Sequence, residues 1–343
     1  METTTLHIGL HSPDRCYLRP SAYVKGLLDF PGRPTGFRWE GELHCWIFPL
    51  SKPHVDALTA HYGDAVVFDP SFSLWDLCRE IRIRQMSPHT LGAYFQYNRD
   101  LLLFANKYPH QLTDDDLRLF IEHLAVTKKC APATVNLAID AIKFYLCGIR
   151  KMHLYLSPRP QKGVRLPSVL STEEVKRLFE VTKNLKHKAI LMTAYSAGLR
   201  VSETANLKVP DIDFDRKLIR VRQGKGKKDR YTVLSSRAAL VLTEYIERYR
   251  PQRWLFEGQK AGERLAVRSL QHVFEDSMRR AGISKDVSFH GLRHSFATHL
   301  LENGIDIRYI KELLGHRSLR TTEIYTHVRQ YKLESIRSPL DMI

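Results

Sequence analysis

Residues 289–328 read FHGLRHSFATHLLENGIDIRYIKELLGHRSLRTTEIYTHV, and this stretch decides which fold we expect for the chain. Its apolar residues recur at helical spacing, and Asn303-Gly304 and Gly315 interrupt them as helix C-caps do. A run of 36 residues inside it holds two imidazoles (His290 and His316), a guanidinium (Arg293) and a phenol (Tyr325). The stretch therefore predicts packed helices that bring several hydrogen-bond donors together.

Two further basic residues lie at breaks in the apolar pattern. Arg200 stands in AGLRVSE between two apolar helical segments. Glu203 follows three residues later and can orient the Arg200 guanidinium. Lys225 stands in QGKGKKDR at the tip of a β-hairpin predicted over 217–235, where glycines let the backbone approach a ligand closely. Eight basic residues and one acid, Asp229, lie between positions 216 and 230.

Together these side chains favour the chemistry of an anion that gains charge. Arginine and histidine donors around one point suit the pentacoordinate phosphorus of a phosphodiester under attack. The phenol would then be the nucleophile, and with an ordinary pKa near 10 it needs positive surroundings and a proton acceptor. A lysine at the hairpin tip can supply the proton that the departing sugar oxygen needs.

Two alternatives compete with this interpretation. His290, His294 and His299 have helical spacing that would suit a zinc site, but carboxylate or cysteine ligands are missing and Arg293 would repel a cation. Each histidine or charge run taken singly is more often an ordinary surface residue. We therefore expect no metal and no other cofactor.

The charge of the chain points to a polyanionic partner. The 343 residues have a formal net charge of +16. Residues 1–70 hold six Lys/Arg against eight Asp/Glu, a net of −2, so the other residues hold 47 against 29, a net of +18. Such a balance favours nucleic acid as the partner.

The motifs resemble the full catalytic set of the tyrosine recombinases, the phage-integrase and Xer-type family, over about residues 72–343. The set consists of Arg200 in GLRVSE, Lys225 in GKG, His290 and Arg293 in HGLRH, His316 in LLGH and Tyr325 in TTEIYTH. The resemblance implies a site-specific DNA recombinase, or integrase, that cuts and rejoins duplex DNA through a 3′-phosphotyrosine intermediate without metal or ATP.

The resemblance also implies a role for each residue. Arg200 and Arg293 would clamp the non-bridging oxygens of the scissile phosphate, with His316 as a further donor. Glu203 would orient the Arg200 guanidinium without contacting the phosphate itself.

The remaining roles concern the nucleophile, the leaving group and the DNA. Tyr325 would form the phosphotyrosine, His290 would assist proton transfer from it, and Lys225 would protonate the leaving 5′-hydroxyl. Four other basic residues in or beside the hairpin are predicted to contact DNA: Arg222, Lys227, Lys228 and Arg230.

The expected fold is mainly α-helical with small β-sheets. We expect an α-helical, SAM-like core-binding domain over 71–152, a linker with three prolines over 153–170, and an α+β tyrosine-recombinase catalytic domain with a C-terminal tail over 171–343. In the family these two domains form a clamp around duplex DNA, and four protomers act together in a synapse.

Residues 1–70 are predicted to form a small, separate α+β extension. Two short aromatic-rich strands are expected over 37–50, a helix over 51–63 and a strand over 65–69. No catalytic spacing occurs here, and the net negative charge favours contact with an accessory protein over DNA binding.

The remaining features point to the bacterial cytoplasm and the nucleoid. The five cysteines are scattered and are expected to be reduced and packed, and no apolar run predicts a signal peptide or a membrane span. Three other activities remain as alternatives: a type IB topoisomerase or hairpin telomere resolvase, a DNA-binding relative that no longer cuts, and a metal nuclease.

Overall fold

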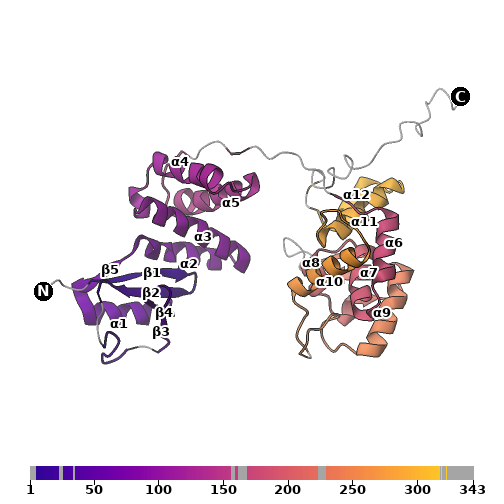
Figure 1. Cartoon of the computed structure of the whole chain (residues 1–343), viewed down its shortest axis with the longest axis horizontal. Coiled ribbons are helices and arrows are strands. Elements are labelled where there is room, and N and C mark those ends of the chain that lie inside the picture. Colours follow the sequence, from indigo (N-terminus) through magenta and orange to yellow (C-terminus); the bar gives the residue numbers. More distant parts are fainter. Residues whose placement is uncertain are drawn as a thin grey trace, which may run out of the picture. The chain divides into compact units, whose positions relative to one another are not determined.

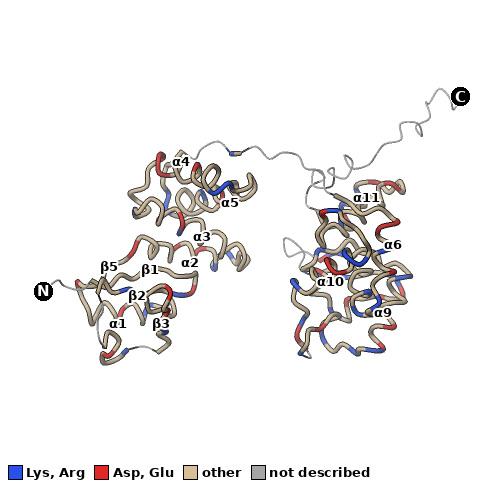
Figure 2. The backbone as a smooth tube through the Cα atoms, viewed as in Figure 1, with Lys and Arg blue, Asp and Glu red and all other residues tan. Residues whose placement is uncertain are grey.

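The computed structural model describes residues 5–22, 26–33, 35–155, 159–160, 168–222, 229–260, 262–316, 318 and 322. The chain forms two compact units, residues 1–163 and 164–343 (Figure 1). Lys and Arg, drawn in blue, occur along both units with Asp and Glu interleaved (Figure 2). No helix among the described residues is long and apolar enough to cross a membrane.

The first unit begins with a five-stranded sheet of order β3-β4-β2-β1-β5. The strands are β1 (Leu6–Ser12), β2 (Arg15–Pro20), β3 (Arg38–Glu40), β4 (Cys45–Pro49) and β5 (Val66–Phe68), and helix α1 (Lys52–Tyr62) joins β4 to β5. The pairs β1–β2, β2–β4 and β3–β4 are antiparallel, and β1–β5 is parallel. The elements predicted over 37–69 are confirmed.

Helices make up the rest of this unit. They are η2 (Pro70–Leu74), α2 (Trp75–Ile83), α3 (Pro88–Ala105), η3 (Pro109–Gln111), α4 (Asp114–Glu122), η4 (His123–Thr127), α5 (Pro132–Ile142) and η5 (Lys143–Ile149). Local caps fix where two of them begin. The Ser87 hydroxyl accepts from the Thr90 N–H at the start of α3, and Thr113 forms a capping box with Asp116 at the start of α4.

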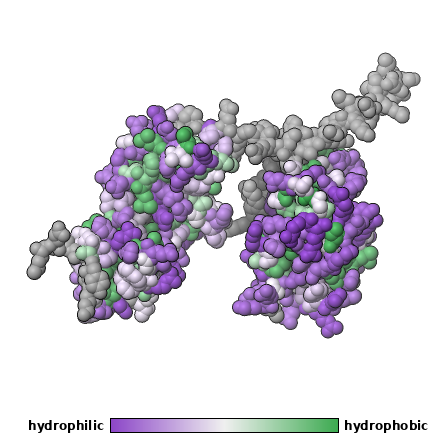
Figure 3. All heavy atoms as spheres, in the orientation of Figure 1, coloured by the Kyte–Doolittle hydropathy of each residue, from purple (hydrophilic) through white to green (hydrophobic). Residues whose placement is uncertain are grey.

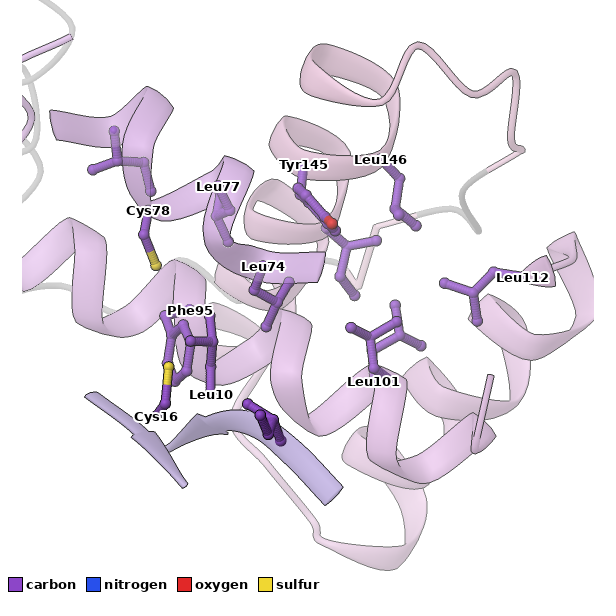
Figure 4. Packing of buried hydrophobic residues seen from close by; sticks show 14 of the residues in the cluster. Leu10, Cys16, Leu74, Leu77, Cys78, Phe95, Leu101, Leu112, Tyr145 and Leu146 are labelled. Atoms are coloured by element: carbon purple, nitrogen blue, oxygen red, sulfur yellow. The ribbon is translucent and has the colours of Figure 1, made fainter. Parts of the chain in front are cut away.

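The sheet and the helices share one hydrophobic core (Figure 4). Leu10 of β1 and Cys16 of β2 pack with Cys78 of α2 and Phe95 of α3. The structure thus differs from the separate extension that the sequence predicted for residues 1–70, because the apolar side chains of β1 and β2 are covered by the helices that follow. Polar contacts cross the same boundary, since Arg99 of α3 donates to the carbonyl of His11 at 2.8 Å.

The second unit combines helices with a three-stranded antiparallel sheet of order β6-β7-β8. Its elements are α6 (Thr172–Val181), α7 (Leu185–Ser196), α8 (Val201–Ala205), η6 (Val209–Asp211), β6 (Ile212–Asp213), β7 (Leu218–Val221), β8 (Arg230–Val233), α9 (Ser236–Tyr249), α10 (Val267–Arg280), α11 (His290–Glu302) and α12 (Ile307–Leu314). Strands β7 and β8 confirm the predicted hairpin. The face of this unit seen in Figure 3 is mostly hydrophilic, while α7 lies largely buried in the core.

Candidate active site

The first part of the site is the break between α7 and α8. Gly198 turns the chain with a φ of +58°, and a Cβ there would lie 2.5 Å from the ring of Phe296. Arg200 is then the N-cap of α8, and its backbone N–H donates to Oε2 of Glu203 at 2.9 Å. The Arg200 guanidinium also donates to Oε1 of Glu203 at 2.7 Å. The orienting contact predicted between these two side chains is present.

Arg293 of α11 is the second guanidinium, and its side chain is 0% exposed. It donates to the carbonyls of Gly198 at 2.7 Å and Leu314 at 2.6 Å, and it lies 3.6 Å from Oε2 of Glu203. Burial of a charge is costly unless carbonyls or an opposite charge compensate for lost water. Arg293 therefore joins three segments at one point: the α7–α8 break, α11 and the end of α12.

A third guanidinium, that of Arg230 in β8, reaches the same carboxylate. It donates to both oxygens of Glu203 at 2.8 Å, and its Nε donates to the carbonyl of Leu313 at 2.9 Å. The side chain is only 11% exposed. The structure thus directs this guanidinium into the protein, whereas the sequence predicted a DNA contact.

Strand register explains this orientation. Val221 pairs with Arg230 and Ile219 pairs with Thr232. Directly opposed residues share a face of the sheet, and Ile219, Val221 and Thr232 are all buried. The inward orientation of Arg230 therefore follows from the pairing of β7 with β8.

The carboxylate of Glu203 balances part of this positive charge. Its burial alone would raise the pKa, but hydrogen bonds from Arg230 and from the Arg200 backbone hold the pKa of Glu203 down at about 2. Three guanidinium groups against one carboxylate leave a net charge of +2. The site is therefore suited to an anion that carries more than one negative charge in a transition state.

Two histidines face this cluster. His290 begins α11, and partial burial with the charges of Arg293 and Arg200 lowers its pKa. His316 follows the C-cap Gly315, and burial with the same arginines lowers its pKa to about 3. Both imidazoles are consequently neutral at pH 7.

Their neighbours limit what the histidines can do. The His290 ring meets that of His294 edge to face at 4.6 Å between centroids, and Nδ1 of His316 lies 2.9 Å from Oγ1 of Thr322. Nδ1 of His299 lies 2.7 Å from the hydroxyl of Tyr195. Within the described parts of the chain, no three His, Cys, Asp or Glu side chains are grouped so as to hold a metal ion.

The structure describes one of the five remaining predicted site residues, Arg222. Arg222 is 41% exposed and pairs with Asp211 at 2.5 Å. The other four lie outside the described residues: Lys225, Lys227, Lys228 and Tyr325.

The sequence is similar to those of known proteins over most of its length. The putative integrase/recombinase y4qK of Sinorhizobium fredii is 38% identical over 273 residues, which cover 78% of this chain and 88% of that protein. The chain belongs to the phage integrase family of tyrosine recombinases. The model of the phage integrase family matches residues 168–332, and that of the phage integrase N-terminal SAM-like domain matches residues 74–149.

Further tyrosine recombinases are similar along most of their length. The tyrosine recombinase XerA of Thermococcus kodakarensis is 37% identical over 264 residues, covering 75% of this chain and 91% of XerA. Neither family model reaches into residues 1–70.

Solved structures of tyrosine recombinases share the fold. The recombinase XerH bound to its difH substrate before cleavage is 26% identical with a TM-score of 0.53, covering 65% of this chain and 69% of XerH. A lambda integrase dimer bound to a core site has a TM-score of 0.61 at 19% identity, covering 76% of this chain and 97% of that one. The predicted fold class, a helical SAM-like domain with an α+β tyrosine-recombinase catalytic domain, is confirmed.

Proposed function

We propose that this tyrosine recombinase is a site-specific integrase that cuts and rejoins duplex DNA through a 3′-phosphotyrosine at Tyr325. The observation that carries the proposal is the cluster of Arg200, Arg230 and Arg293 around Glu203, beside two neutral imidazoles. Such a cluster is fixed before substrate binds, so little reorganisation is needed when charge develops on phosphorus.

The phosphate would be held by the two arginines that start α8 and lie within α11. Arg200 and Arg293 would donate to the non-bridging oxygens, whose negative charge grows as phosphorus becomes pentacoordinate. His316 would add a neutral donor through the ring nitrogen that does not face Thr322.

Two proton transfers would accompany the exchange of bonds at phosphorus. The Tyr325 oxygen forms a bond to phosphorus as the bond to the 5′-oxygen breaks, and neutral His290 takes the phenolic proton. Lys225 gives a proton to the departing 5′-oxygen. A 5′-hydroxyl of another strand then reverses these steps, so one phosphate ester replaces another and no ATP is consumed.

The partners follow from the same proposal. Duplex DNA would lie against the basic hairpin through Arg222, Lys227 and Lys228, and four copies of the chain would assemble in the synapse. Residues 1–70 would contact an accessory protein. The enzyme would act in the cytoplasm, at the nucleoid.

The test is an assay for a covalent adduct that survives SDS. Nicked duplex fragments of the DNA that flanks the gene are incubated in EDTA with the wild-type protein or with Tyr325→Phe, and the adduct is resolved on a denaturing gel. We expect an adduct with the wild type alone. Intact DNA binding by both proteins without any adduct would contradict the proposed function.

A further inference from the structure

The side chain of Arg230 is only 11% exposed, and its guanidinium donates to protein groups within the arginine cluster. It lies in β8, directly after the hairpin tip, and it is 27 positions from Glu203 in the chain. Its guanidinium donates hydrogen bonds to both oxygens of that carboxylate. Arg200 donates to the same two oxygens, through its guanidinium and its backbone N–H, so both arginines share one carboxylate.

The first consequence concerns charge. A buried carboxylate attracts every guanidinium near it, and Arg293 lies 3.6 Å away from Oε2 of Glu203. Arg230 donates to both oxygens at 2.8 Å, so Glu203 has a positive partner besides Arg200, which donates to Oε1 at 2.7 Å. Arg200 and Arg293 then retain a joint charge of +2 for the substrate.

The second consequence concerns geometry. The Nε of Arg230 holds the Leu313 carbonyl at the end of α12. A Cβ added at Gly315 would lie 2.8 Å from Cδ of Arg230, so the arginine stem lies directly against the turn that leads to His316. One side chain therefore links the base of the hairpin, the start of α8 and the turn before His316.

We propose that Arg230 is a positioning residue for strand cleavage: it neutralises Glu203 and thereby keeps Arg200 and Arg293 available to the scissile phosphate. The proposal rests on the proposed function and deepens it. Replacement of Arg230 leaves the Glu203 carboxylate to draw the other two arginines away from the phosphate, and it lowers the net charge of the site from +2 to +1.

A double-mutant cycle separates this role from simple loss of packing. The variants are Arg230→Met, Glu203→Gln and the two combined, and the measurement is the single-turnover rate constant for adduct formation at saturating DNA. We expect Arg230→Met to slow cleavage about 100-fold, the scale of losing one preorganised donor group. The double variant regains the net charge of +2, and we expect it to be about tenfold faster than Arg230→Met.

The exposed pair Arg268–Glu275, at 3.3 Å on α10, provides the matched control. Arg268→Met, Glu275→Gln and their combination are expected to leave the rate constant unchanged, because both partners stay hydrated. Melting temperatures of all variants are measured alongside.

Each result decides the proposal. Wild-type speed in Arg230→Met, or a double variant no faster than Arg230→Met, would overturn it. If Arg230→Met does not fold, Arg230→Gln replaces it. If neither variant folds, Glu203→Gln is added to each, and a melting transition that returns supports the proposal. The absence of that transition overturns the proposal. If the wild type itself forms no adduct, the proposed function fails, while the melting temperatures still test the coupling between Arg230 and Glu203.

Discussion

The two units of the chain bury polar side chains in different ways. Among the described residues of the first unit, the buried polar side chains are Ser71, Asn98 and Asn136, and none of them is charged. The second unit buries Arg293 and Glu203 completely or nearly so. A buried charge lowers stability unless hydrogen bonds and opposite charges fully compensate for the lost water. The difference therefore indicates that the second unit is less stable than it could be at its candidate active site.

The strongest test of this comparison is to divide the chain. The core of the first unit joins β1 and β2 to the helices, so a fragment of residues 70–155 would lose the cover of several leucines, each worth about 1.5–3 kcal/mol. We expect that fragment to show no cooperative thermal transition by circular dichroism. Residues 168–343, with a core of their own, are expected to melt cooperatively.

The opposite result would restore the separate extension that the sequence predicted. If residues 70–155 melt with the same midpoint as residues 1–155, the sheet does not contribute to the helical core.

Arg293→Met tests the buried charges directly. Loss of the guanidinium leaves the carbonyls of Gly198 and Leu314 without its hydrogen bonds and removes a positive neighbour of Glu203. We expect the free energy of unfolding to fall by about 3–5 kcal/mol and the cleavage rate constant to fall about 1000-fold.

Phe95→Leu is the matched change in the core of the first unit. It should cost about 1–1.5 kcal/mol of stability and leave the cleavage rate constant at saturating DNA unchanged. An equal loss of cleavage in both variants would show that the chemistry does not depend on the buried charges.

Gly198→Ala tests the break that aims Arg200. The alanine would need a φ near +58° and would place its Cβ 2.5 Å from the Phe296 ring, so we expect a loss of about 2–4 kcal/mol. Gly304→Ala is the control, because it has a φ of +81° but no atom within 4 Å of the added Cβ, and it should cost about 1–2 kcal/mol. Urea titrations measure the free energy of unfolding of both variants. Equal losses in the two variants would contradict the role given to Gly198.

The smallest effect is a dependence of stability on pH. Burial lowers the pKa of His294 to about 4 and, with Arg293, that of His316 to about 3. The unfolded chain, with ordinary values near 6.5, therefore binds protons first as the pH falls. Stability is fully present above pH 6.5 and decreases below it, by up to about 1.4 kcal/mol per pH unit for each histidine.

Urea titrations at pH 7.5, 6.5 and 5.5 measure this slope, and His294→Gln should make it shallower. A slope that is unchanged in His294→Gln would mean that this histidine is as easily protonated in the folded protein as in the unfolded chain.

Local signals predicted more of this molecule than long-range ones. Ser87, Thr113 and Ser171 each cap a helix by accepting from a backbone N–H only three positions away, so such caps can be recognised locally in the sequence. The contact between Arg200 and Glu203 was equally accessible, since these residues are also three positions apart. The partner of Arg230 was not, since it lies in another element and becomes visible only once the register of β7 and β8 is known.

The boundary predicted near residue 70 was wrong for a related reason. An alternating strand shows which of its faces is apolar, but not which element covers that face. The sequence over 6–20 therefore does not show that β1 and β2 contact Cys78 and Phe95, because that contact depends on tertiary packing.

The most direct test of the central claim is to identify both ends of the covalent bond. The adduct formed by the wild-type chain is digested with protease and nuclease, and the modified peptide is sequenced by mass spectrometry. We predict a nucleotide attached through its 3′-phosphate to Tyr325. Attachment to another residue, or through a 5′-phosphate, would contradict the assignment of the arginine cluster and Tyr325 as one active site.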